Sequence, residues 1–467
     1  MSENSVVLDV SPKRPCATTV ARKLQDFNKE VTSKNNSNIL STEKWQSLGT
    51  ILVEAASCLD DSDSTKSFHR PLVDTFRFMR NACAGVVDNV ISVVSQPVLL
   101  SSAVQLVRLC SGPAKLSTDD AGAVGAVRCG VQFLGNLVSS CDKAKEHVWK
   151  AMFIQKPSLF CTLLAHKDDK VRLYSSMLLY NCLSPERCQA FLADMSSSAT
   201  ISCLADMLAK ADSEWSLFTL GLLVQNDFFH HVYPVLDLKS RCVVLDVIID
   251  KLDQPEARRE GAAISSSLLE YLCEHFRGRV MDIVKTAQPE TMQDDLDPVE
   301  ITKVLELLCA ASVHPSFSST LKEKEPLLEM ALDILKTVHF LGKVENNVFS
   351  RVQHLDDLAE AQEGESDLAE HPVFGFKRKL VRLIGNLCHG SRRNQDLVRN
   401  MEGIPLILDV CNLDARNPSD IIQWSILAVR NLLENNLENQ AIVAGLVKKG
   451  VVTDSPLLKE MGVRLEL

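Results

Sequence analysis

Apolar residues recur along most of the chain at the spacing of an α-helix. From Thr42 onward, apolar segments of roughly 12–18 residues alternate with short polar connectors. Ile422, Ile426, Val429 and Leu433 occupy positions i, i+4, i+7 and i+11, which lie on one side of a helix. The strict alternation of apolar and polar residues that marks half-buried strands is absent. The pattern therefore predicts an all-α protein.

A short motif around an asparagine recurs along these helical segments. Its copies are centred on Asn81, Asn136, Asn181, Asn386 and Asn431. Asn136 and Asn181 are 45 residues apart, and so are Asn386 and Asn431. Solenoids of the armadillo and HEAT type repeat every ~40–47 residues, because their short helices bury apolar faces only by stacking on the next repeat. We therefore expect an armadillo/HEAT-like, right-handed superhelical solenoid.

Two further marks accompany the motif. A second asparagine follows eight residues after the first in three copies, at Asn89, Asn394 and Asn439. One copy then continues into Gly403-Ile404-Pro405. This order resembles the armadillo consensus, in which the third helix of a repeat carries the Asn and Gly-Ile-Pro begins the next repeat. The match is least regular over residues 200–340, where we expect irregularly packed helices.

Changes in composition divide the chain into four parts. Seven acids and no base lie between Asp356 and Glu370, which is typical of a flexible insertion. Residues 20–31 have the pattern of a short amphipathic helix. The predicted parts are a partly disordered N-terminal extension at 1–38, irregular armadillo-like repeats at 39–344, the acidic flexible insertion at 345–371, and C-terminal armadillo repeats at 372–467.

Length, charge and cysteine content limit which classes of protein the chain can belong to. A chain of 467 residues is too long for one compact core, which stops growing near ~250–300 residues. The net charge of −10 argues against a nucleic-acid binder, because such proteins gain affinity by neutralising phosphates. The odd number of cysteines, 15, and the lack of any Cys-x-x-Cys pair favour a reducing compartment over a disulfide framework. Neither a signal peptide nor an apolar run of about 18 residues is present, so we expect a soluble intracellular protein, in the cytosol or the nucleus, without membrane insertion.

The C-terminal stretch resembles one known family in particular. The segments that carry the likeness are Phe374-Gly375-Phe376-Lys377-Arg378-Lys379-Leu380, Gly385-Asn386-Leu387-Cys388 and Ala428-Val429-Arg430-Asn431-Leu432. They look like the conserved C-terminal domain of the ataxin-10 family. The resemblance implies a cytoplasmic, perinuclear adaptor, with roles in neurite outgrowth, neuronal survival and cytokinesis. It also implies a presence at the centrosome, the basal body and the midbody.

The asparagine ladder is the first candidate binding site. In peptide-binding armadillo proteins the third-helix Asn side chains hold an extended peptide backbone, because an amide both donates and accepts hydrogen bonds. The alternative is that the five Asn residues satisfy backbone groups between repeats, as buried polar residues must. Nuclear-import members of the superfamily carry a Trp four residues before each Asn. Those positions here hold Arg77, Gln132, Met177, Arg382 and Leu427, which argues against the second functional hypothesis, a karyopherin-like cargo receptor.

Two charged features are further candidates. Seven bases follow the acidic insertion, at Lys377, Arg378, Lys379, Arg382, Arg392, Arg393 and Arg399. This basic patch could receive an acidic or phosphorylated partner, or it could be covered by the acidic insertion of the same chain. Ser11 precedes Pro12-Lys13-Arg14, which matches a proline-directed kinase site whose phosphate would act through its charge.

Motifs for catalysis or metal binding are missing. The sequence contains no phosphate-binding Gly-x-x-x-x-Gly-Lys, no Gly-x-Ser-x-Gly and no His-Glu-x-x-His. His230-His231 and Cys388-His389 lack further ligands at zinc spacing. We therefore predict a non-enzymatic scaffold that binds proteins and uses no cofactor, metal or small-molecule substrate. The apolar stretch Val443–Val452 leaves homo-oligomerisation open.

Overall fold

The computed structural model describes most of the chain as helices. The described residues are 16–33, 39–59, 66–112, 121–210, 213–254, 263–285, 298–343, 349, 375–410 and 421–446. No strand occurs among them, so the all-α prediction is confirmed. The chain forms two compact units, 1–223 and 224–467, a boundary that the sequence pattern did not indicate. The hand of the superhelix stays a prediction.

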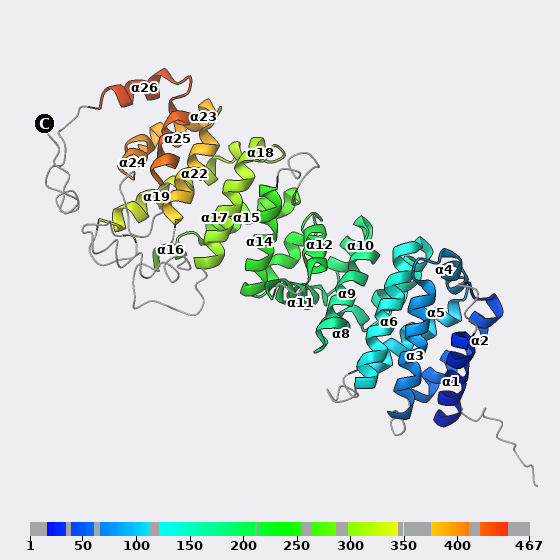
Figure 1. The fold of residues 1–467 in the computed structure, drawn as a ribbon. Helices are drawn as coiled ribbons and strands as arrows, with labels where there is room; N and C mark the ends of the chain where they lie inside the picture. The colour runs from blue at the N-terminus through cyan, green and yellow to red at the C-terminus, as the bar shows by residue number, and fades with distance from the viewer. Residues whose placement is uncertain are drawn as a thin grey trace, which may run out of the picture. The chain divides into compact units, whose positions relative to one another are not determined.

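The first unit is built from two rows of stacked helices (Figure 1). One row consists of α3, α6, α9 and α12, and the other of α2, α5, α8 and α11. A π-helical turn at Lys150–Ile154 follows α7. The helices are α1 (Ala17–Ser33), α2 (Thr42–Leu59), α3 (Lys66–Cys83), α4 (Val87–Val94), α5 (Pro97–Ser111), α6 (Ala121–Ser140), α7 (Asp142–Trp149), α8 (Leu159–Leu164), α9 (Asp169–Cys182), α10 (Pro185–Leu192), α11 (Ser197–Ala209) and α12 (Glu214–Leu223).

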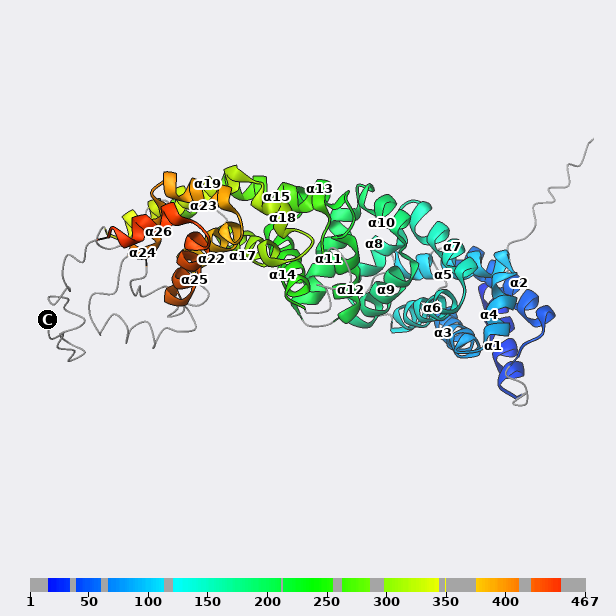
Figure 2. The same ribbon diagram turned by 90° about the horizontal axis from the view of Figure 1, so that it is seen from above.

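The second unit repeats this plan. Helices α14, α17, α22 and α25 stack in one row, with α15, α19 and α23 beside them (Figure 2). A short 3-10 turn at Tyr233–Val235 follows α13. The helices are α13 (Phe229–Val232), α14 (Leu238–Asp253), α15 (Ser266–Arg279), α16 (Asp282–Lys285), α17 (Pro298–Val313), α18 (Ser318–Lys322), α19 (Glu325–Leu341), α22 (Phe376–Cys388), α23 (Arg392–Asn400), α24 (Gly403–Asp409), α25 (Ile421–Leu433) and α26 (Leu437–Ala444).

The predicted amphipathic helix near the N-terminus is confirmed as α1. Val20, Leu24 and Phe27 recur at i, i+4 and i+7 and are buried, and α1 packs against α2 and α3. This helix therefore contributes to the core of the first unit. Residues 1–15 lie outside the described part of the chain, as does the predicted acidic insertion apart from Phe349.

Helix α6 is apolar on nearly every side because it is covered on both flanks. It is long and apolar enough to cross a membrane by length and composition, but 61% of its most apolar window is buried inside the unit. It packs between α3 and α9. A helix with apolar residues all round is expected at such a position in a protein core.

The glycine that precedes the asparagine in two copies of the motif permits close helix stacking. A Cβ at Gly385 in α22 would lie 3.0 Å from both the Cα and the Cβ of Ala428 in α25. A Cβ at Gly135 in α6 would lie 2.9 Å from the Cε of Met177 in α9. At Gly385 the contact is with backbone and Cβ atoms, so a side chain there would force α22 and α25 apart by a few tenths of an ångström. At Gly135 the flexible end of Met177 would have to move.

Candidate functional site

The repeated asparagines complete the hydrogen bonds of helix ends. The last four carbonyl groups of an α-helix lack partners within the helix. At the end of α22, Asn431 Nδ2 donates to the Gly385 oxygen at 3.0 Å. Asn394 Nδ2 donates to the Leu387 oxygen at 2.8 Å. Thus one asparagine from the next repeat and one from the following helix satisfy two carbonyls of the same helix end.

The same arrangement recurs in the first unit. At the end of α3, Asn136 Nδ2 donates to the Arg80 oxygen at 2.9 Å, and Asn89 Nδ2 donates to the Ala82 oxygen at 2.7 Å. Arg80 and Ala82 flank Asn81 as Gly385 and Leu387 flank Asn386. The two units therefore use the asparagine motif in the same register.

The other members of the ladder differ in their surroundings. Asn386 donates to Ser312 Oγ at 2.9 Å in α17. Asn181 is half-buried and makes no hydrogen bond with a residue that the structure describes. Asn81 is exposed, and its Oδ1 accepts from Arg80 Nε at 3.0 Å.

The inter-repeat role suggested as the alternative is thus visible at three of the five ladder positions. Asn386 and Asn431 are only 7% and 6% exposed. Asn136 donates an amide hydrogen to a carbonyl of the neighbouring helix. These contacts leave little of the amides for a ligand. A peptide-holding role for the ladder stays a prediction, and Asn81 offers the most accessible amide for it.

The predicted basic patch is divided between two helices and is largely paired. Lys377 is only 5% exposed, because its Nζ donates to the buried Phe349 oxygen at 2.9 Å. It therefore does not lie on an exposed patch. Lys379 Nζ lies 2.8 Å from Glu306 Oε2. The Arg382 guanidinium lies 4.9 Å from the centroid of the Trp424 ring, within the range of a cation–π contact.

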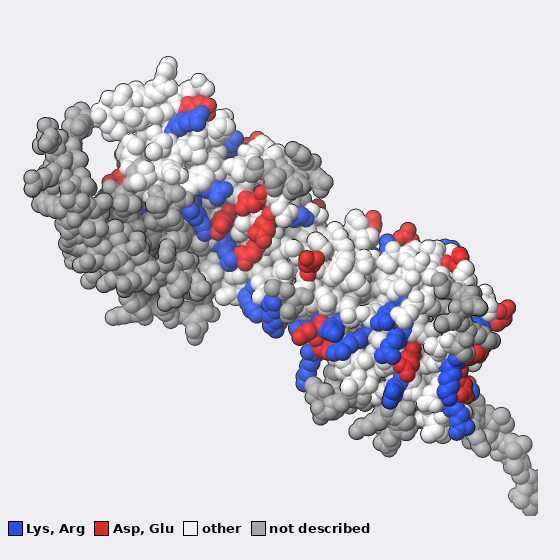
Figure 3. Space-filling view, in the orientation of Figure 1, with Lys and Arg blue, Asp and Glu red and all other residues white. Residues whose placement is uncertain are grey.

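The three arginines of the patch on α23 also meet acids. Arg392 and Arg399 both contact Asp396 and Glu438, and Arg393 pairs with Glu325. Figure 3 likewise shows basic and acidic side chains next to one another on the second unit in this view. Apart from the Phe349 oxygen that binds Lys377, the observed partners of the basic patch lie outside 345–371. Coverage of the patch by the acidic side chains of the insertion therefore stays a prediction. Ser11, the predicted phosphorylation site, lies outside the described residues.

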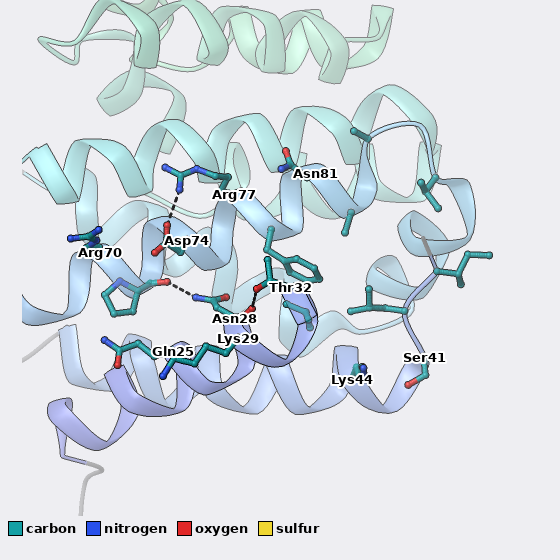
Figure 4. A pocket seen from close by; sticks show the side chains of 18 residues that line it. Gln25, Asn28, Lys29, Thr32, Ser41, Lys44, Arg70, Asp74, Arg77 and Asn81 are labelled. Atoms are coloured by element: carbon teal, nitrogen blue, oxygen red, sulfur yellow. Dashed lines mark hydrogen bonds and ion pairs between the residues drawn. The ribbon is translucent and has the colours of Figure 1, made fainter. Parts of the chain in front are cut away.

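A pocket between α1 and α3 is a feature that the sequence did not predict. It has a volume of about 940 Å³. In Figure 4, α3 forms one wall with Arg70, Asp74, Arg77 and Asn81, which recur at i, i+4, i+7 and i+11. The opposite wall is α1, and the start of α2 closes one end. The lining residues on α1 and α2 that Figure 4 labels are Gln25, Asn28, Lys29, Thr32 and Lys44, with Ser41 just before α2.

Polar contacts fix the two walls of this α1–α3 pocket. Asn28 Nδ2 in α1 donates to the Pro71 oxygen in α3 at 3.2 Å, and Thr75 Oγ1 donates to Asn28 Oδ1 at 3.2 Å. Beneath them, the Phe27 and Phe78 rings pack edge to face with centroids 5.8 Å apart. The walls are thus held together by an aromatic contact and by hydrogen bonds, so the pocket is built into the fold.

The pocket has an excess of positive charge. Four of its lining residues are cations, at Lys29, Lys44, Arg70 and Arg77, and one is an acid, Asp74. Arg77 Nη1 lies 2.7 Å from Asp74 Oδ1. Lys44 Nζ lies 3.5 Å from Glu30 Oε1. Lys29 and Arg70 are exposed and pair with no residue that the structure describes.

A cluster of titratable residues lies buried in the second unit. Glu300 is 2% exposed, and it accepts a hydrogen bond from Tyr233 Oη at 2.8 Å. His275 Nε2 and Arg241 Nη2 lie 3.2 and 3.4 Å from its carboxylate oxygens. Burial alone would raise the pKa of Glu300, but these partners hold it below its usual value. The cluster connects α14, α15 and α17 through a buried ion pair, and we interpret it as a structural contact in the core of the second unit.

Comparison with known proteins places the chain in a family. Residues 376–467 match the spinocerebellar ataxia type 10 protein domain. Ataxin-10 of Xenopus tropicalis is 34% identical over 397 residues, which cover 84% of this chain and 78% of the relative. The chain belongs to the ataxin-10 family. Ataxin-10 of Homo sapiens is 31% identical over 88% of this chain and 83% of its own. The ataxin-10 homolog of Dictyostelium discoideum is 44% identical over 91 residues, 20% of this chain and 15% of its own.

Some of the candidate sites lie inside the matched ataxin-10 domain and one lies outside it. The ataxin-10 domain begins at Phe376, the first residue of α22, and so contains the basic patch and the second-unit asparagines. The α1–α3 pocket lies in the first unit, outside that domain. A solved engineered protein aligns with 90% of this chain and 96% of its own at 13% identity, but its TM-score of 0.26 is too low to assign a fold. Among the described residues, no group of three or more His, Cys, Asp or Glu side chains is arranged to hold a metal ion.

Proposed function

We propose that this ataxin-10 family member is a non-enzymatic adaptor that binds other proteins along its helical repeats. The observation that carries the proposal is the α1–α3 pocket, because its walls combine cations that pair with no described residue, the exposed amide of Asn81 and apolar side chains. Surfaces that mix charge with apolar anchors are typical of protein interfaces. The described lining includes no histidine or cysteine that could serve as a base or nucleophile.

From the family resemblance we further propose the cellular setting. The protein would act in the cytoplasm close to the nucleus, in neurite outgrowth, neuronal survival and cytokinesis, and at the centrosome, basal body and midbody. Imaging of the tagged full chain through the cell cycle tests this setting. Enrichment at centrosomes and at the midbody is expected, and an even distribution at every stage would contradict it.

Site-specific photo-crosslinking tests the adaptor function. A benzophenone amino acid replaces Arg77 in the pocket, and the control replaces Met195, which is 99% exposed and lies outside the pocket. Discrete crosslinked proteins are expected at position 77 and not at position 195. If the full chain purifies alone and position 77 captures no more than position 195, the adaptor proposal is wrong.

A nuclear-transport receptor is the competing hypothesis. Two of the five positions that hold Trp in import receptors are basic here, Arg77 and Arg382, and they would repel a basic signal peptide. A labelled nuclear-localisation peptide should therefore bind the full chain only weakly. Micromolar or tighter binding would favour the transport receptor instead.

A further inference from the structure

The charges of the α1–α3 pocket are arranged for an acidic ligand. Lys29 on α1 and Arg70 on α3 stand on opposite walls (Figure 4) and pair with no residue that the structure describes. A carboxylate between the walls could interact with both cations. Arg77 and Lys44 each pair with an acid, so among the described residues Lys29 and Arg70 are the pocket cations left to bind a ligand.

The end of the pocket near α2 has a different character. Ile39 is 52% exposed there, and Phe78, Ala82, Ala84 and Val86 add apolar surface. Binding is favoured when a ligand covers an exposed isoleucine and the apolar side chains beside it, because this removes apolar surface from water. The pocket therefore combines cations along its walls with an apolar surface at the α2 end, where Lys44 is paired with Glu30.

We propose that the α1–α3 pocket binds a protein segment that carries both carboxylates and apolar anchor residues. The carboxylates would meet Lys29 and Arg70, and the apolar side chains would cover Ile39 and Val86. The exposed Asn81 amide between these ends could donate to the backbone of the segment. The inference rests on the proposed adaptor function and specifies the chemistry of the partner.

Charge complementarity favours this ligand over the other classes. The pocket contains four cations and one acid, whereas the whole chain carries a net charge of −10, so the pocket is a local positive site on an acidic protein. A nucleic acid would find no extended basic surface here, and it would leave the apolar end uncovered. Electrostatic attraction also predicts that binding weakens as salt rises, since charges at the surface are screened.

Binding of three matched peptides to the full chain tests the proposal. The probe is a fluorescein-labelled 16-residue peptide of Glu, Ala and Leu, with Leu at every third or fourth position. One control peptide replaces each Glu with Gln, and the other replaces each Leu with Ser. Fluorescence anisotropy should show the probe binding at least about tenfold more tightly than either control at low salt.

Protein variants complete the test. Lys29→Glu with Arg70→Glu should weaken probe binding at least about tenfold, and a peptide with Lys in place of Glu should bind this variant better than it binds the wild type. The control variant, Lys143→Glu with Lys170→Glu, makes the same change in net charge. Both control residues are exposed in the first turns of α7 and α9, where a carboxylate is tolerated.

Three outcomes would overturn the proposal. The Gln peptide could bind as tightly as the probe, the pocket variant could bind the probe like the wild type, or a short single-stranded oligonucleotide could displace the probe as well as the unlabelled peptide does. Circular dichroism confirms that each variant is folded, and Lys29→Gln with Arg70→Gln replaces the charge reversal if it is not. Crosslinks at position 77 without peptide binding would refute the partner chemistry and leave the adaptor function standing.

Discussion

Replacement of Asn394 tests the role that the structure gives to the repeated asparagines. Asn394 is 2% exposed. Its Nδ2 donates to the Leu387 oxygen at 2.8 Å and to the Lys322 oxygen at 2.9 Å, so it ties α23 to the ends of α22 and α18. In Asn394→Ala both carbonyl groups would lose this donor, the Leu387 carbonyl at a buried position and the Lys322 carbonyl at a half-buried one.

The expected loss of stability follows from these two contacts. A buried acceptor without a donor costs about 1–3 kcal/mol, so the substitution should destabilise the second unit by roughly 2–5 kcal/mol. In a domain of 150–250 residues each kcal/mol lowers the melting temperature by about 2–4 °C. A destabilisation of about 3 kcal/mol would therefore lower it by roughly 6–12 °C.

Asn394→Asp should be worse at neutral pH and should recover in acid. Its carboxylate would face two carbonyl oxygens, so the pKa of the new carboxyl in the folded protein should rise above the unfolded value of about 3.9. A raised folded pKa means that the destabilisation is present above that pKa and disappears as pH falls, because the protonated carboxyl can donate one hydrogen bond. The melting deficit relative to wild type should shrink between about pH 7 and pH 4.

The assay is differential scanning calorimetry of the full chain, with hydrogen exchange of residues 376–444 to locate the effect. Asn400→Ala is the matched control, because Asn400 is exposed at the end of the same helix. If Asn394→Ala melts within 1 °C or so of this control, carbonyl satisfaction is not what the asparagine contributes, and the reasoning fails.

Three further predictions concern the first unit. Two hydrogen bonds from Arg128 hold the pKa of Asp168 below its usual value. The stability that this pair adds, about 1 kcal/mol, should therefore be present above pH ~4 and lost as pH falls. Asp168→Asn keeps the helix cap, so its melting temperature should differ from that of wild type at pH 7 and converge with it in acid. A Cβ at Gly130 would lie 2.5 Å from Val107 Cγ2, so Gly130→Ala should cost about 1–3 kcal/mol in denaturant titrations, and Val107→Ala in the same chain should recover part of that loss. Burial raises the pKa of Cys83 to about 12, so alkylation followed by mass spectrometry should label Cys83 far more slowly than the exposed Cys16 between pH 7 and 9.

The asparagine motif shows where sequence reasoning reaches its limit. The spacing of 45 residues identifies the repeat, and both alternatives for the asparagines were chemically sound. Only the structure shows that Asn431 reaches back to Gly385 in the preceding third helix. A side-chain amide can bind a peptide or a neighbouring helix equally well, and the choice depends on which groups the packing brings within about 3 Å.

The basic patch and the apolar positions of α25 (Ile422, Ile426, Val429 and Leu433) also show that burial and pairing cannot be predicted from sequence spacing. Lys377 belongs to a run of bases in the sequence, yet it is buried against the Phe349 carbonyl. Ile426 belongs to the predicted apolar stripe of α25, yet it is 64% exposed, while Ser425 and Ala428 are buried on the face toward α22. The close approach at Gly385 selects small residues for that face, which an apolar periodicity cannot indicate.

The sequence by itself determined the helices, the repeat and the family, because helix periodicity and motif spacing are properties of residues that are near one another along the chain. The tertiary structure alone decided which amides meet which carbonyls, which cations are paired, and that Lys29 and Arg70 stand on opposite walls of one pocket. Those relations join residues that are tens of positions apart, such as Asn28 in α1 and Pro71 in α3. They arise only when stacked helices bury their apolar faces together, and that packing fixes the distances at which charges and hydrogen bonds act.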